Sequence, residues 1–234
     1  YHADFFGFIV AKIMSRKKLV WNIRHSNLDK NANKWLTLRI VRVNTYLSRY
    51  VDVITYNSYK AKENHLQIGY TGKRTSVIPN GFELDRFRFS PSERDSIRNE
   101  LGLTDEKVII TVGRWDVQKD YYTLMAALHI LQKKHANFKM VMVGENLDWD
   151  NKELVDLIKK SDLESKIFLL GRRVDIPALL SAADIYVSSS LGESFSNSIG
   201  EAMACELSCV VTDVGHSKII VGDTGVVIEA GDYG

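Results

Sequence analysis

An arginine and a lysine lie five positions apart in the polar segment 113–120, directly after the apolar run 108–112. The apolar run predicts a buried strand, and the amphipathic pattern that follows it predicts a helix. Gly113 would let a ligand approach the backbone at the end of the strand. Arg114 and Lys119 could then hold a diphosphate, because cations and a helix N-terminus both attract phosphate oxygens. The alternative is a solvated loop whose charges are unrelated.

A second candidate region follows the strand-like run Ile185–Ser188. The polar residues at positions 196–198 precede a helical pattern, and serine and asparagine are typical of a helix N-terminus. The first N–H groups of a helix lack partners within the helix and attract anions. Glu193 and Glu201 add carboxylates that could accept hydrogen bonds from hydroxyl groups. We therefore predict a sugar, a diphosphate and a ribose side by side here, although each residue alone would also fit an exposed loop or helix.

His25 directly follows the strand-like run 19–24, and ligands of parallel sheets bind where the strands end. A hydrogen-bonding or polarising role is one interpretation of this histidine, and a loop residue without a role is the other. We interpret His65, His129 and His135 as surface or core residues.

No metal ion is expected from the sequence. The six histidines and two cysteines lack the spacing of a zinc site, so we expect Cys205 and Cys209 to pack as small hydrophobic residues. Asp148-Trp149-Asp150 has the D-x-D form used by one class of metal-dependent sugar transferases. It follows a predicted strand, and we interpret Asp148 or Asp150 as a helix cap instead.

The elements that position these residues follow from a hydrophobic period that switches between strand-like and helix-like. The strand-like runs are 19–24, 52–56, 75–78, 108–112, 139–143, 166–170, 185–188 and 209–212. The helical patterns are 4–14, 34–48, 59–68, 91–101, 121–134, 153–160, 176–183 and 196–205. Strands that alternate with helices predict an α/β fold with parallel sheets covered on both faces. No G-x-G-x-x-G follows a strand, which disfavours a dinucleotide-dependent oxidoreductase.

The composition is that of a globular protein. The 234 residues are 45% hydrophobic and 26% charged, which excludes collagen, coiled coils and a mostly disordered chain. The apolar runs are much shorter than the ~20 residues of a spanning helix. Two cysteines are too few for a disulfide scaffold and fit a reducing compartment, so we expect a cytoplasmic location.

The charge is distributed unevenly along the chain. Residues 1–90 carry 16 Lys and Arg against 6 Asp and Glu, whereas residues 91–234 carry 15 against 23. The sign changes close to Pro79 and Pro91, which bracket a polar stretch that contains Asn80-Gly81. We therefore predict a domain boundary near residue 85, with domains 1–85 and 86–234.

The basic first region is suited to phosphates, nucleic acid or an anionic membrane surface. Residues 34–49 form a basic amphipathic pattern, which could lie on an anionic membrane or could be an ordinary helix packed on a sheet. Because this region lacks a recognisable nucleic-acid motif, no nucleic-acid partner is expected.

Several motifs together resemble the retaining, GT-B-fold glycosyltransferases of family 4. Glu193 and Glu201 resemble the double-glutamate signature of that family, and Val112-Gly113-Arg114 with Lys119 resembles its diphosphate-binding turn. Segment 77–87 resembles its interdomain segment. Further blocks that match in order and spacing are 182–190, 201–205, 213–215 and 222–225. The match is strong over 75–231 and weaker over 1–74.

The resemblance implies a GT-B-like fold of two Rossmann-like domains and metal-independent transfer of a hexose with retention of configuration. The donor would be a UDP- or GDP-linked sugar, and the acceptor a glycan or lipid-linked molecule at the inner face of the membrane. Catalytic roles would fall to His25, Arg114, Lys119 and Glu193. Donor-binding roles would fall to Phe195, Ser196, Asn197, Ser198 and Glu201. Alternatives are an epimerase or hydrolase on the same fold, or a non-catalytic nucleotide-sugar-binding subunit.

The chain also departs from the family pattern. Asp120 stands where a glycine usually follows the lysine, and His216 and Ile219 replace a common glycine and glutamate. Relatives are longer, so we expect an N-terminal domain that is incomplete and a C-terminal domain that lacks its last helix. The substituted positions fall in loops that the family places near the donor, and both cations and both glutamates are in place.

Overall fold

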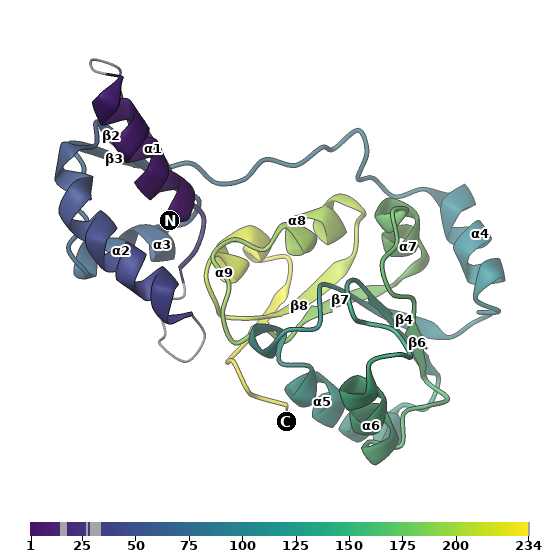
Figure 1. Ribbon diagram of the computed structural model, residues 1–234. Helices are drawn as coiled ribbons and strands as arrows, with labels where there is room; N and C mark the ends of the chain where they lie inside the picture. Colours follow the sequence, from purple (N-terminus) through teal and green to yellow (C-terminus); the bar gives the residue numbers. More distant parts are fainter. Residues whose placement is uncertain (15–17, 27, 29–33, 234) are drawn as a thin grey trace. The chain divides into compact units, whose positions relative to one another are not determined.

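The computed structural model describes residues 1–14, 18–26, 28 and 34–233. The chain divides into two compact units. Unit 1 comprises Tyr1–Gly81 and the short segment Gly192–Phe195, and unit 2 comprises Phe82–Leu191 and Ser196–Gly234. The main division thus lies between Gly81 and Phe82, and the assignment of a later segment to unit 1 was not anticipated from the sequence. Each unit is described by itself (Figure 1).

Unit 1 is built on a three-stranded parallel sheet in the order β1-β2-β3. The strands are β1 (Val20–Ile23), β2 (Val53–Tyr56) and β3 (Arg74–Val77), and the helices are α1 (His2–Ile13), α2 (Trp35–Leu47), η1 (Ser48–Tyr50) and α3 (Tyr59–Gln67). Alternate residues of β1 and β2 are buried, as a strand with one covered face requires. Trp21, Ile54 and Tyr56 form the centre of this core with Val41 of α2.

Unit 2 is built on a six-stranded parallel sheet in the order β6-β5-β4-β7-β8-β9. Its strands are β4 (Lys107–Val112), β5 (Phe138–Val143), β6 (Ile167–Leu169), β7 (Ile185–Ser188), β8 (Ser208–Thr212) and β9 (Val226–Ile228). Its helices are α4 (Pro91–Glu100), η2 (Val117–Lys119), α5 (Tyr121–Lys134), α6 (Lys152–Lys160), α7 (Ile176–Ala182), α8 (Asn197–Ala204) and α9 (Ser217–Val221).

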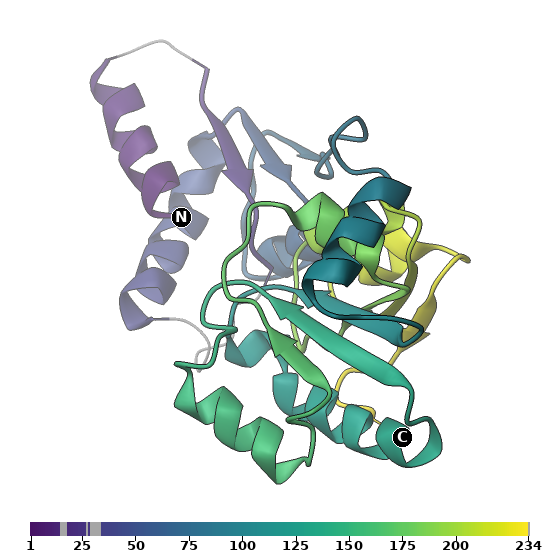
Figure 2. The ribbon, with the colours of Figure 1, turned by 90° about the vertical axis from the view of Figure 1, so that its right-hand side faces the viewer.

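Both faces of the unit 2 sheet are covered, because successive strand residues point to opposite sides. In β4, Val108 and Ile110 pack into one core with residues of α4, α7, α8 and α9. Ile109 points into a second core with residues of α5 and α6. Figure 2 shows helices on the two sides of this sheet. The near-continuous apolar runs in the sequence are the consequence of this double burial.

The α/β class with parallel sheets is confirmed, and each of the predicted strands and helices is present within two residues of its predicted ends. The short elements β9, α9, η1 and η2 were missed, because three to five residues do not establish a hydrophobic period. Cys205 and Cys209 are free and buried, which confirms that they pack as small hydrophobic residues. No helix in the described ranges has the length and apolar character needed to cross a bilayer.

Candidate functional site

The order of the unit 2 strands defines one place where a ligand can enter. From β4 the chain adds β5 and then β6 on one side, and it then returns to add β7, β8 and β9 on the other side. β4 and β7 are therefore adjacent strands whose connections leave in opposite directions. In open parallel sheets, ligands bind outside the carboxyl ends of strands at such a switch point. Arg114 and Lys119 follow β4, and α8 follows β7 (Figure 1).

Two glycines bring the backbone segments after β4 and β5 close together. The N–H of Gly113 donates to the carbonyl of Val143 over 2.9 Å, and the N–H of Trp115 donates to the carbonyl of Glu145 over 2.8 Å. Gly144 lies at φ +144°, and a Cβ atom there would lie 1.7 Å from the carbonyl oxygen of Gly113. The turn that carries Arg114 is thus fixed to the neighbouring strand end by contacts that only glycine permits.

Asp116 organises the turn after β4. One of its carboxylate oxygens accepts from the backbone N–H of Gln118 over 2.9 Å and the other accepts from Arg114 Nε over 3.0 Å. Burial alone would raise the pKa of Asp116, but the Gln118 N–H and the Arg114 guanidinium outweigh it and hold this pKa below its ordinary value. The Arg114 side chain remains 62% exposed, so its guanidinium is oriented by Asp116 while it stays accessible.

Lys119 ends the short helix η2, and its side chain runs back across Gly113. The position that a Gly113 Cβ would occupy lies 3.2 Å from Lys119 Cε. The next residue, Asp120, is left-handed at φ 48° and ψ 56°, and its carboxylate accepts from the N–H of Thr123 over 3.3 Å to cap α5. Aspartate tolerates this backbone region better than most residues. Asp120 therefore fulfils the conformational role of the expected glycine and adds a helix cap.

Hydrogen bonds join the loops after β4 and β7 to each other and to the end of β8. Ser189 Oγ donates to the carbonyl of Lys119 over 2.8 Å, and the N–H of Leu191 donates to the carbonyl of Gln118 over 2.8 Å. Thr212 Oγ1 donates to the carbonyl of Ser190 over 2.6 Å. Ser189 and Thr212 were not predicted from the sequence as positioning residues. Their only signal was a run of small polar residues directly after an apolar strand.

The helix α8 begins after Ser196, which lies at its N-cap but whose side chain accepts no capping hydrogen bond from the backbone of the helix. The Ser196 hydroxyl instead lies 3.2 Å from the hydroxyl of Ser198, which accepts from the Tyr186 hydroxyl over 2.8 Å. The predicted serines thus form a chain of hydroxyl groups with β7. Asn197 is exposed in the first turn of α8.

Glu201 lies within α8, one residue after a glycine that is covered by an aromatic ring. A Cβ atom on Gly200 would lie 2.1 Å from the Phe82 ring. Burial raises the pKa of the half-buried Glu201 carboxyl, Arg86 opposes this effect and Glu83 adds to it. Segment 82–87 therefore sets the electrostatic surroundings of Glu201.

Glu201→Gln is expected to raise the melting temperature of the protein at pH 7 and to leave it unchanged at pH 4. The folded-state pKa of Glu201 is raised, so its stability contribution is complete below the unfolded pKa and is lost as the pH rises through the folded pKa. Glutamine is neutral at both pH values and avoids this loss. Calorimetry at the two pH values tests this, with the exposed Glu206→Gln as matched control. A variant that melts below the native chain at pH 7 would contradict it.

The predicted site residues are distributed over both units. Arg114, Lys119, Ser196, Asn197, Ser198 and Glu201 belong to unit 2, whereas His25, Glu193 and Phe195 belong to unit 1. Within unit 1, His25 follows β1 and its ring contacts that of Tyr1 edge-on at 6.2 Å. The carbonyl of Glu193 accepts from Ser26 Oγ over 2.8 Å, and the buried Ser194 hydroxyl donates to Asn57 Oδ1 over 2.6 Å.

The interpretation of Asp148 or Asp150 as the cap of the next helix is wrong. Asn151 lies at the N-cap of α6, and its side-chain oxygen accepts from the N–H of Leu154 over 3.2 Å. Asp148 instead accepts from the N–H of Asp150 over 3.1 Å and stabilises the preceding turn. Among the residues that the structure describes, no three His, Cys, Asp or Glu side chains are placed to hold a metal ion.

Solved structures show which class of fold these units represent. HepE of Anabaena, crystallised in complex with UDP, superimposes with a TM-score of 0.86 at 27% identity, over 99% of this chain and 64% of that chain. Sucrose-phosphate synthase of Thermosynechococcus elongatus gives a TM-score of 0.82 at 21% identity, over 99% of this chain and 59% of its own. The fold is thus the α/β, parallel-sheet fold of GT-B glycosyltransferases.

The sequence match identifies the family. Residues 106–234 match the family model described as glycosyl transferases group 1, and the chain belongs to this family. An uncharacterized glycosyltransferase of Methanocaldococcus jannaschii is 26% identical over 207 residues, which are 87% of this chain and 50% of that protein. A galactosyltransferase of Escherichia coli that uses UDP-Gal and a GlcNAc-diphosphoundecaprenol is 31% identical over 169 residues, 68% of this chain and 42% of that enzyme. The chain thus spans about half the length of these curated relatives.

Proposed function

We propose that this chain is part of a retaining family 4 glycosyltransferase, which transfers a hexose from a UDP- or GDP-linked donor to a glycan or lipid-linked acceptor without a metal ion. The observation that carries the proposal is the turn after β4. Arg114 and Lys119 lie on this turn beside the switch point of the unit 2 sheet, and the turn is hydrogen-bonded to the loop after β7. The Anabaena protein, 27% identical, was crystallised with UDP and also with UDP-glucose.

In this proposal the two cations stabilise the leaving diphosphate. Negative charge develops on the phosphate oxygens as the bond to the sugar breaks, and preorganised cations lower the free energy of that state. Asp116 fixes one edge of the Arg114 guanidinium and leaves the other N–H groups available for phosphate. The N-terminus of α8 favours an anion in the same way. These groups would replace a divalent cation.

The remaining roles are proposed on the family pattern. Glu193 binds hydroxyl groups of the donor sugar, and Glu201 accepts hydrogen bonds from the ribose. Backbone N–H groups near Phe195, Ser196, Asn197 and Ser198 contact phosphate or sugar. His25 hydrogen-bonds or polarises the sugar. The acceptor hydroxyl attacks from the face that the leaving group departs from, and the leaving phosphate takes its proton, which retains the anomeric configuration.

Calorimetric titration of the chain with UDP and with GDP, each in the presence of EDTA, tests the donor site. We expect one of the two nucleotides to bind, with an affinity that EDTA does not change. Failure of both to bind would refute the assignment of the site. Binding that EDTA abolishes would refute its independence of metal.

Product analysis by mass spectrometry separates transfer from the competing activities. Incubation with a nucleotide-sugar and an acceptor is expected to yield the glycosylated acceptor and free nucleoside diphosphate. Free sugar alone would indicate a hydrolase, and an isomerised donor an epimerase. UDP binding without turnover of any donor would indicate a binding subunit.

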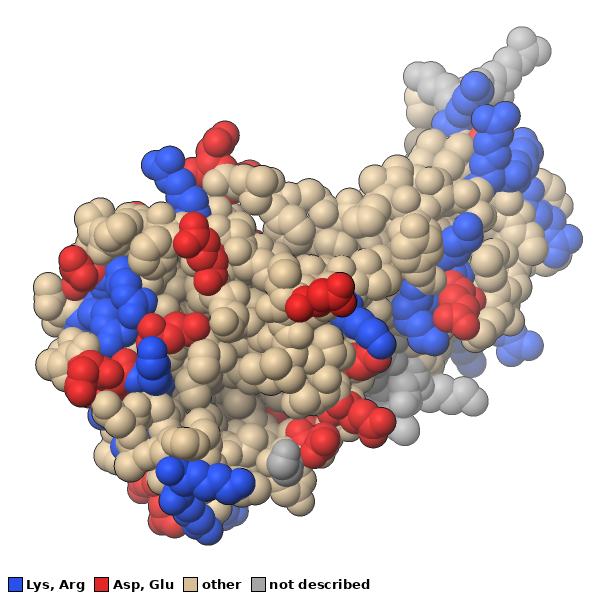
Figure 3. Space-filling model, turned by 180° about the vertical axis from the view of Figure 1, so that it is seen from behind, with Lys and Arg blue, Asp and Glu red and all other residues tan. Residues whose placement is uncertain are grey.

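We further propose that the protein acts in the cytoplasm, with unit 1 at the inner face of an anionic membrane. α2 packs on the unit 1 core through Val41 and exposes Trp35, Leu36 and Tyr46. The Arg39 guanidinium lies 4.8 Å from the centre of the Trp35 ring. Lysine and arginine predominate on the part of unit 1 visible in Figure 3. Aromatic rings beside basic residues are suited to the boundary between lipid headgroups and acyl chains.

Flotation with vesicles that contain phosphatidylglycerol tests this surface. We expect binding at low salt, with loss at high salt because exposed charges are screened. Replacing Arg39 and Arg42 with glutamine should reduce binding by about thirtyfold, since each of the two basic residues near the membrane contributes about 1 kcal/mol. Replacing Lys159 and Lys160 of α6 with glutamine removes the same charge from unit 2 and serves as the control. Equal flotation of both variants would contradict the proposal.

A further inference from the structure

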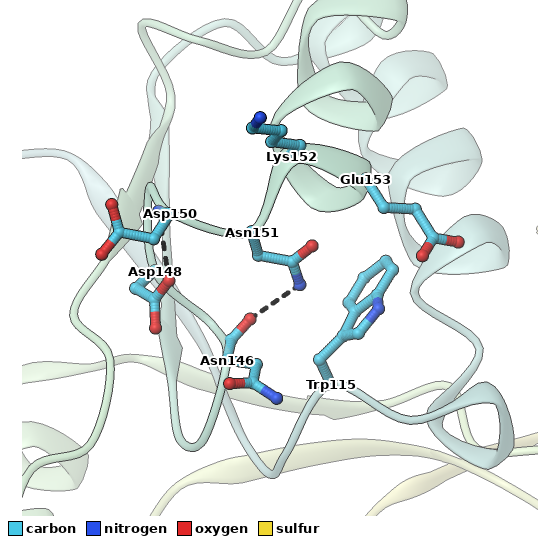
Figure 4. Close-up of a pocket in the computed structure, with 7 residues that line it drawn as sticks. All are labelled: Trp115, Asn146, Asp148, Asp150, Asn151, Lys152 and Glu153. Carbon is cyan, nitrogen blue, oxygen red and sulfur yellow. Dashed lines mark hydrogen bonds between the residues drawn. The ribbon is translucent and has the colours of Figure 1, made fainter.

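A pocket of about 520 Å³ opens at the carboxyl ends of β4 and β5, outside the residues proposed to bind the donor. Trp115 lines it from the turn after β4. The loop between β5 and α6 and the first turn of α6 contribute the other lining side chains: Asn146, Asp148, Asp150, Asn151, Lys152 and Glu153 (Figure 4). Its volume lies within the range of sites that bind small molecules.

The walls of this pocket are held in place by contacts within unit 2. The Trp115 ring stacks on the Tyr121 ring with centroids 5.4 Å apart and planes within 7°. Tyr122 donates its hydroxyl hydrogen to Glu153 Oε1 over 2.6 Å. Asn151 Nδ2 donates to the carbonyl of Asn146 over 2.9 Å and so joins two of the lining residues, as Figure 4 shows. The pocket is therefore formed before a ligand arrives, which lowers the cost of binding.

The charge of the lining excludes anions. Asp148, Asp150 and Glu153 place three carboxylates around the pocket, and Lys152 supplies one cation. This excess of negative charge disfavours a phosphate or a nucleoside diphosphate. The described acidic side chains are also not arranged as the ligands of a metal ion. A neutral ligand with several hydrogen-bond donors fits the lining best.

The planar groups that line the pocket limit the chemical class of the ligand further. Carboxylate and amide groups are planar and can accept hydrogen bonds from two neighbouring hydroxyl groups. The electron-rich face of an indole ring attracts C–H groups that carry a small positive charge. A pyranose ring offers both features, with hydroxyl groups at its rim and C–H groups on its faces. We propose that this pocket binds a neutral pyranose unit, at a site separate from that of the donor.

Saturation-transfer NMR on the chain, with UDP at saturation, tests the proposal. The probes are the methyl α-pyranosides of glucose, galactose and mannose, together with N-acetylglucosamine. We expect at least one of them to bind in the millimolar range. Binding by none of them would overturn the proposal, and so would displacement of the sugar by UDP. Since the readout does not need the donor site to function, it is independent of the proposed transferase activity.

Substitutions locate the binding in the pocket. Trp115→Ala should weaken sugar binding by about tenfold, as expected for the loss of an aromatic contact of about 1.4 kcal/mol. Trp115→Phe keeps an aromatic ring against Tyr121 and should retain most of the binding, which separates loss of contact from loss of folding. Trp149→Ala is the matched control, because Trp149 is a tryptophan of the loop between β5 and α6, is 51% exposed and is not among the residues that line the pocket. Equal effects of Trp115→Ala and Trp149→Ala would overturn the assignment.

Charged probes test the chemical class of the ligand. Asp150→Asn removes a charge and keeps a planar hydrogen-bonding group, so sugar binding should change by less than about threefold. Methyl phosphate and tetramethylammonium both carry methyl protons that this measurement detects, and neither should give a signal that depends on Trp115. A tetramethylammonium signal that Asp150→Asn abolishes would show a cation site instead and overturn the proposal.

Discussion

Replacing Lys119 with alanine is expected to weaken nucleoside diphosphate binding by about tenfold to a hundredfold. A hydrogen bond to a charged group contributes about 1.5–3 kcal/mol, and the Lys119 ammonium is proposed to contact the phosphates directly. The rate of transfer should fall further, by about a hundredfold or more, because the charge on the leaving diphosphate increases in the transition state. Calorimetric titration gives the first quantity, and steady-state kinetics with the complete donor gives the second.

The matched control for this substitution is Lys134→Ala. Lys134 lies in the last turn of α5, whereas Lys119 lies just before the first turn of the same helix. Both changes remove one positive charge from unit 2, so a general effect of net charge would appear in both variants. Nucleotide affinity equal to that of the native chain in Lys119→Ala would refute the proposed diphosphate site. An equal loss in both variants would show that only the overall charge matters.

The fold could be predicted from the sequence where burial leaves a periodic pattern. The run at 108–112 is apolar except for Thr111 because β4 is covered on both faces, and the helix that follows buries residues at helical spacing, at 121, 124, 125 and 128. β9 and α9 carry no such pattern, because they are short and partly exposed at the edge of unit 2. The cap of α6 was misplaced for a related reason. Three residues in the segment 148–151 have side chains suited to capping, and local sequence does not choose among them.

The candidate site could be predicted only in part. Residues that follow strands, such as Arg114, were identified because the carboxyl ends of parallel strands meet at one edge. The hydrogen bonds that hold these residues in place were not identified, since Ser189 and Lys119 are 70 positions apart and only the fold brings them together. The left-handed backbone conformation of Asp120 could not be predicted either, because the sequence does not distinguish a left-handed aspartate from a helical one. Long-range contacts and backbone conformation thus account for most of what was missed.

Gly144→Ala is expected to destabilise unit 2 by about 3–5 kcal/mol, which would lower its melting temperature by roughly 10 °C. Two effects add. The backbone of Gly144 has φ +144°, which alanine adopts only under strain, and the new Cβ would lie 1.7 Å from the carbonyl oxygen of Gly113. Relief of this clash would require moving the end of β5 away from the end of β4, and the turn after β4 carries Arg114 and Trp115. Unfolding by heat and by urea measures the change.

Gly102→Ala separates these two effects. Gly102 has φ +64°, but a Cβ atom there meets no neighbour within 4 Å. This variant should therefore lose only the conformational term of about 1 kcal/mol. If Gly144→Ala cost no more than Gly102→Ala, the close approach of the two strand ends would be of no energetic importance. If it costs several times more and also weakens nucleotide binding in the fraction that remains folded, the same contact both stabilises the sheet and holds the cation-bearing turn in place.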